Sequence, residues 1–134
     1  FDRDLQRPGL PRDVAALVDH LAGDAVGVQL VNCSRHESRR LIVQAGAFGE
    51  HSFTHVRTEN AAEEGGPTVT DVNGQYLAVD LPPSTRIRLD AGLSRFSNQP
   101  SYAFPWHGGE IPIPFPLDRG GEGHSGSAWV APEK

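Results

Sequence analysis

The sequence predicts a mainly β protein, an antiparallel β-sandwich or jelly roll with one short N-terminal amphipathic helix. Short segments in which apolar and polar residues alternate recur at intervals of about 10 to 15 residues. Turn-forming Gly, Pro, Asn and Ser separate these segments. The length of 134 residues is sufficient for one hydrophobic core, so we expect a single domain.

The helix is expected in residues 12–23, RDVAALVDHLAG. Its apolar residues recur at i, i+3, i+4 and i+7, which places them on one helical face: Val14, Leu17, Val18 and Leu21. Asp13 stands near the start and Gly23 just past the end, as is typical of helix termini. Such a helix would cover one face of a sheet.

Strands are expected from residue 25 onward, where the apolar period changes to two. The predicted strands are residues 25–32, 39–48, 51–58, 75–81 and 85–93. The last is the clearest, because Ile87, Leu89 and Ala91 alternate with charged residues of both signs. We therefore expect one buried face and one solvated face with cross-strand salt bridges. The Asn73-Gly74 pair is typical of a tight hairpin turn.

The domain is predicted to span residues 12–96, including the leading helix. Residues 1–11 are charged and contain Pro and Gly, which is typical of a linker or an arm. Residues 97–134 form a tail rich in Pro, Gly and aromatic residues, and we expect it to pack on the domain or on a partner. The chain begins at Phe1 and contains no Met, so we expect a processed product or a piece of a longer protein.

Composition excludes several classes of function. The 12 Lys and Arg residues against 17 Asp and Glu give a net charge of −5, which would repel the phosphates of a nucleic acid. The single cysteine, Cys33, excludes an internal disulfide. No apolar run approaches the ~20 residues of a membrane span, and no signal-peptide pattern opens the chain. We expect a soluble protein, in a compartment that the sequence leaves open.

His51, His55 and Glu59 are the candidate metal ligands, because they recur at intervals of four residues. On a helix this spacing would bring two imidazoles to one face. On a strand, however, His51 and His55 stand roughly 13 Å apart, too far to share an ion with bonds of ~2.1 Å. We therefore expect a polar strand edge with no metal, no cofactor and no catalytic residue.

Four aromatic or imidazole side chains mark the candidate binding site: Tyr102, Phe104, Trp106 and His107. Flat rings beside hydrogen-bonding groups can stack on a sugar. Large aromatic residues in Pro-rich segments also anchor one domain on another. The sequence leaves both interpretations open, with docking favoured.

Three motifs carry a resemblance to a known group of domains. They are VQLVN at residues 28–32, QAGAFGEH at residues 44–51 and LPPST at residues 81–85. With these motifs, residues 26–106 resemble the C-terminal β-sandwich domains that follow the catalytic barrel in some bacterial carbohydrate-active proteins. Ser84 departs from the glycine found in the third motif.

This resemblance implies a non-catalytic accessory module of a larger, glycoside hydrolase-like protein. Its partner would be the catalytic domain or subunit, and carbohydrate is the implied ligand. Two alternatives stay open. One is a small cupin-like, metal-dependent enzyme that uses His51, His55, His107 and a glutamate. The other is a free-standing lectin-like module that uses Tyr102 and Trp106.

Overall fold

The computed structural model describes residues 1–60 and 66–107. Contacts divide the chain into two units, Phe1–Gln99 and Pro100–Lys134. All strands of the described residues lie in the first unit, and every strand pair is antiparallel. The prediction of a mainly β, antiparallel fold is therefore confirmed.

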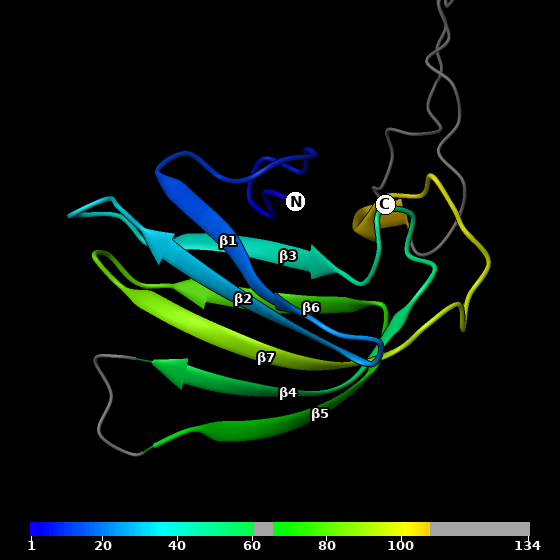
Figure 1. Cartoon of the computed structure of the whole chain (residues 1–134). Coiled ribbons are helices and arrows are strands. Elements are labelled where there is room, and N and C mark those ends of the chain that lie inside the picture. The colour runs from blue at the N-terminus through cyan, green and yellow to red at the C-terminus, as the bar shows by residue number, and fades with distance from the viewer. Residues whose placement is uncertain (61–65, 108–134) are drawn as a thin grey trace, which may run out of the picture. The chain divides into compact units, whose positions relative to one another are not determined.

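The strands form two sheets (Figure 1). The larger sheet is five-stranded, in the order β1 (Val14–Leu21), β2 (Ala25–Asn32), β7 (Arg86–Ser94), β4 (Ser52–Asn60) and β5 (Thr68–Gly74). The smaller sheet pairs β3 (Arg39–Gln44) with β6 (Tyr76–Leu81). Both sheets contribute to one core, whose buried apolar residues are Leu30, Leu41, Ala45, Phe53, Val56, Val79, Leu81, Ile87, Leu89 and Ala91.

The predicted N-terminal helix is wrong, because residues 14–21 form strand β1. This strand pairs with β2 from Val14 opposite Asn32 to Leu21 opposite Val26. A β-bulge between Val18 and His20 shifts the register by one residue. Val18 and Leu21 therefore share a face of the strand although they are three residues apart. This separation of three residues is the one expected between apolar residues on one face of a helix.

The expected hairpin at Asn73-Gly74 is also wrong. The strands on either side of this pair belong to different sheets, since β5 pairs with β4 whereas β6 pairs with β3. Asn73 has a φ of 50°, a left-handed conformation that Asn tolerates better than most residues. The pair therefore turns the chain from one sheet into the other.

The outer face of the five-stranded sheet carries the predicted cross-strand salt bridges. The Arg88 guanidinium donates to both carboxylate oxygens of Asp19, at 3.0 and 2.8 Å, and to Asp90 Oδ1 at 2.5 Å. The two bonds from Arg88 to Asp19, and one from Gln29, lower the pKa of the Asp19 carboxyl to about 2. A Cβ atom at Gly27 would lie 2.5 Å from Arg88 Nη2, so this glycine leaves room for the ion pair.

Residues 1–11 lie against the edge of the smaller sheet. Asp2 forms a β-bridge with Leu41, and Arg3 N–H donates to the Arg40 carbonyl oxygen at 3.2 Å. The buried Asp2 carboxylate accepts the N–H groups of Asp4 and Leu5, which closes a turn within this segment.

Within residues 1–60 and 66–107, no helix is long and apolar enough to cross a bilayer.

Candidate functional site

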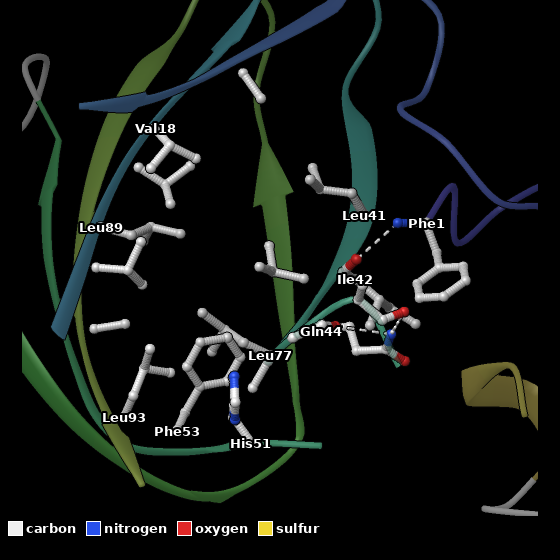
Figure 2. Close-up of a pocket in the computed structure, with 18 of the residues that line it drawn as sticks. Phe1, Val18, Leu41, Ile42, Gln44, His51, Phe53, Leu77, Leu89 and Leu93 are labelled. Carbon is white, nitrogen blue, oxygen red and sulfur yellow. Dashed lines mark hydrogen bonds between the residues drawn. The ribbon is translucent and has the colours of Figure 1, made fainter. Parts of the chain in front are cut away.

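An apolar cavity of about 660 Å³ lies between the two sheets. Its walls come from the inner faces of β1, β2 and β7 on one side and from β3, β6 and the N-terminal segment on the other, where Phe1 and Leu10 line it. Figure 2 shows Val18, Leu89 and Leu93 on one side, Leu41 on the other, and His51 beside Phe53 at one end. The cavity is thus apolar along its length and polar at one end.

The strand arrangement explains why this space is not filled. The larger sheet has five strands and the smaller sheet has two, so part of the inner face of β1 and β2 has no strand opposite it. Val18, on that face, remains 57 % exposed. Small side chains at Ala16 and Ala91 enlarge the space further.

The polar end of the cavity is built by the corner between β3 and β4. Gly46 and Gly49 have φ values of 92° and 68°, a region in which only glycine is unstrained. The Glu50 carboxylate folds over Gly46, where a Cβ atom would lie 2.2 Å from Glu50 Oε1. Hydrogen bonds from the backbone N–H groups of Glu50 and Phe48 hold the pKa of the Glu50 carboxyl below its usual value. The corner therefore presents a fixed carboxylate.

His51 is held rigidly beside this carboxylate. Its side chain is 9 % exposed, and its Nδ1 accepts the Phe96 N–H at 2.9 Å. The neutral ring must therefore carry its proton on Nε2. Nε2 lies 3.8 Å from Glu50 Oε2, beyond hydrogen-bond distance. A donor and an acceptor thus stand side by side at the end of the cavity without bonding to each other.

Asn98 stabilises this corner and was not singled out by sequence reasoning. Its Nδ2 donates to the carbonyl oxygens of Gly49 and His51, at 3.2 and 2.9 Å, and to Ser52 Oγ at 3.0 Å. The residue lies in a polar segment after the last strand, where alternation gives no signal. Its role depends on contacts with residues more than 40 positions away in the chain.

The candidate metal ligands lie on different faces of the larger sheet. His51 lines the cavity, whereas the His55 ring lies on the outer face over Gly92, where a Cβ atom would lie 2.5 Å from His55 Cε1. Glu59, near the other end of β4, is opposite Arg88 in the register with β7. In the described ranges, no group of three or more His, Cys, Asp or Glu residues could hold a metal ion.

The predicted binding residues belong to the second unit, of which residues 100–107 are described. Pro105–His107 form a short 3-10 helix that brings three rings together. Phe104 lies 5.3 Å from Trp106 and 5.3 Å from His107, between ring centroids, and Phe104 N–H donates to His107 Nδ1 at 3.2 Å. Tyr102 precedes this cluster by two residues in the sequence.

No protein-family model matches the chain, and no curated protein matches it. The resemblance to accessory domains therefore rests on the three motifs alone.

Proposed function

We propose that this chain is a non-catalytic accessory β-sandwich module of a larger carbohydrate-active protein. It docks on a catalytic domain or subunit through edge strand β1. One observation supports this proposal above the others. The large apolar residues of β1 are exposed to solvent, with Leu17 at 58 %, Val18 at 57 % and Leu21 at 72 %.

An edge strand with exposed apolar side chains is a site at which another protein surface binds. Proteins protect such edges with charged residues, but the carboxylate of Asp19 on β1 is already bound by Arg88. Leu17 lies opposite Gln29 in the register with β2 and therefore shares the outer face with Arg88. An apolar partner surface bordered by polar groups would fit this strand.

The sandwich assignment rests on two antiparallel sheets that share one apolar core. The motifs that suggest the accessory class also have structural roles here. Gln44 Nε2 donates to the carbonyl oxygens of Gly46 and Ala47 at 3.1 and 3.0 Å, which closes the corner of the second motif.

The test measures hydrogen exchange of the β1 amides in the isolated chain and in the longer polypeptide that contains it. We expect slower exchange in the longer polypeptide, and a Leu17→Ser variant should lose that protection. Val69→Ser is the matched control, because Val69 is 62 % exposed on β5, the opposite edge of the same sheet. Equal exchange in both proteins, or turnover of a glycoside by the isolated chain, would contradict the proposal.

A further inference from the structure

We propose that the cavity between the two sheets binds a small hydrocarbon alcohol. Its hydroxyl group would lie at His51 and Glu50, and its apolar part among the side chains of β2 and β7. This proposal goes beyond the docking of β1. Of the three exposed apolar residues on that strand, Leu17 lies on the outer face, whereas Val18 and Leu21 line the cavity, so binding is tested on the isolated chain.

The size and the lining of the cavity fit a small apolar molecule. A volume of about 660 Å³ lies within the range of ~300 to ~1,000 Å³ that is usual for ligand pockets. Val28 and Leu30 of β2 and Leu89 of β7 line its inner wall. Desolvation of a hydrocarbon chain against these residues would provide most of the binding free energy.

The polar end fits a hydroxyl group in particular. His51 Nε2–H is a donor and Glu50 Oε2 is an acceptor, and these two atoms are 3.8 Å apart. One oxygen atom can lie within ~2.8 to ~3.0 Å of both atoms. A hydroxyl group there accepts from His51 and donates to Glu50, so both polar atoms gain a partner.

Other polar groups fit this end less well. A carboxylate would be repelled by Glu50, and a ketone has no proton to donate to Glu50 Oε2. Arg95 also lines the cavity, but its Nε and Nη2 donate to the carbonyl oxygens of Gly23 and Ala22 at 2.5 and 2.9 Å. These two donors are therefore already engaged in holding the turn between β1 and β2.

The test titrates the isolated chain at neutral pH with 1-octanol, 2-octanone and octanoate and records methyl NMR spectra. We expect saturable shifts of the Val28 and Leu89 methyl groups, with 1-octanol bound most tightly and octanoate at least about tenfold more weakly. The absence of saturable shifts, or shifts confined to the outer face, would overturn the site. Equal binding of 1-octanol and octanoate would overturn the assignment to an alcohol.

Three variants localise the site. Ala16→Phe should abolish binding because Ala16 lines the cavity, whereas Ala15→Phe, on the outer face of the same strand, should leave binding unchanged. Equal effects of these two variants would contradict a cavity site.

Glu50→Gln keeps an acceptor for Phe48 N–H but removes the charge, so the affinity for octanoate should rise about tenfold relative to that for 1-octanol. Unchanged discrimination would show that Glu50 does not face the ligand.

Discussion

The Asn32 side-chain amide donates to the Leu81 carbonyl oxygen at 3.0 Å across the protein interior. The same Nδ2 donates to the carbonyl oxygens of Glu37 and Pro82, while Oδ1 accepts the Ser34 N–H. One buried side chain thus connects the end of β2, the following loop and the turn after β6. The VQLVN motif at residues 28–32 and the LPPST motif at residues 81–85 are thus joined by hydrogen bonds of the Asn32 side chain.

Replacement of Asn32 by Leu should destabilise the protein by about 2–4 kcal/mol, because it leaves several buried backbone groups without partners. Urea unfolding monitored by circular dichroism measures this change. Ser34→Ala is the comparison, because it removes the hydroxyl group that accepts the His36 and Glu37 N–H groups in the same loop but keeps the Ser34 N–H that donates to Asn32. An effect of Asn32→Leu no larger than that of Ser34→Ala would show that the amide is not the connection.

Replacement of Ser84 by glycine should stabilise the protein. Its φ is 54°, a left-handed conformation that costs a non-glycine residue about 1–2 kcal/mol. Ser84 is also the position at which the LPPST motif departs from the glycine found in the accessory domains that this sequence resembles. We expect Ser84→Gly to stabilise the protein by about 0.5–1 kcal/mol after the larger chain entropy of glycine is deducted.

Asn73→Gly is the comparison for this prediction. Asn73 has a similar φ of 50° but tolerates it better, so the gain there should be smaller. A loss of stability in Ser84→Gly would mean that the serine hydroxyl contributes more than the strained backbone costs. Thermal unfolding of the two variants under one set of conditions decides between these outcomes.

The Asp19 ion pair depends on the absence of a side chain at Gly27. A Cβ atom there would lie 2.5 Å from Arg88 Nη2 and 2.7 Å from Asp19 Oδ1. Both atoms are ends of flexible side chains, so Gly27→Ala should fold but displace the pair. We expect the pKa of Asp19 to rise toward its ordinary value in this variant, as measured by carboxyl NMR. An unchanged pKa would show that the pair finds another geometry.

Strict alternation made the inner and outer faces of β7 predictable. Ile87, Leu89 and Ala91 are buried as expected, and the Arg88 side chain forms ion pairs on the outer face. The position of β1 was not predictable, because its bulge reproduces the apolar spacing of a helix although the strand pairs with β2, the next segment of the chain. Local periodicity cannot distinguish a bulged edge strand from a short amphipathic helix.

The candidate site was predicted only in part. The sequence singled out His51 as a candidate metal ligand and Glu50 as part of the motif at residues 44–51, and both side chains line the polar end of the cavity. The cavity results from the unequal widths of the two sheets, which no local pattern encodes. The bond from Phe96 to His51 and the bonds from Asn98 join residues more than 40 positions apart, and they required the fold to be known.

The aromatic residues of the second unit provide the test of sugar binding. If Trp106 contributes a stacking face, soluble oligosaccharides should quench or shift tryptophan fluorescence, and Trp106→Ala should abolish binding on a glycan array. Tyr102→Ala should weaken binding less. Trp106→Phe is the control, since it retains a flat ring and should keep part of the affinity. The absence of binding to any glycan by the wild-type chain would leave docking as the role of these residues.

The last prediction concerns acid stability. Arg88 and Gln29 lower the pKa of Asp19 from 3.8 to about 2, so the folded state favours the ionised carboxylate. A depressed pKa contributes stability that is fully present above the unfolded value of 3.8 and is lost as the pH falls toward about 2. Asp19→Asn cannot ionise, so the stability difference between wild type and Asp19→Asn should be constant near neutral pH and shrink through this window.

Urea unfolding of both proteins at a series of pH values measures that difference. Asp71→Asn on β5 is the matched control, because this exposed aspartate forms none of the ion pairs found on β1 and β7. The stability difference between wild type and Asp71→Asn should change less between pH 3.8 and about 2. A difference for Asp19→Asn that stays constant down to pH ~2 would show that the carboxylate has the same pKa folded and unfolded. The bidentate contact with Arg88 would then not persist in solution.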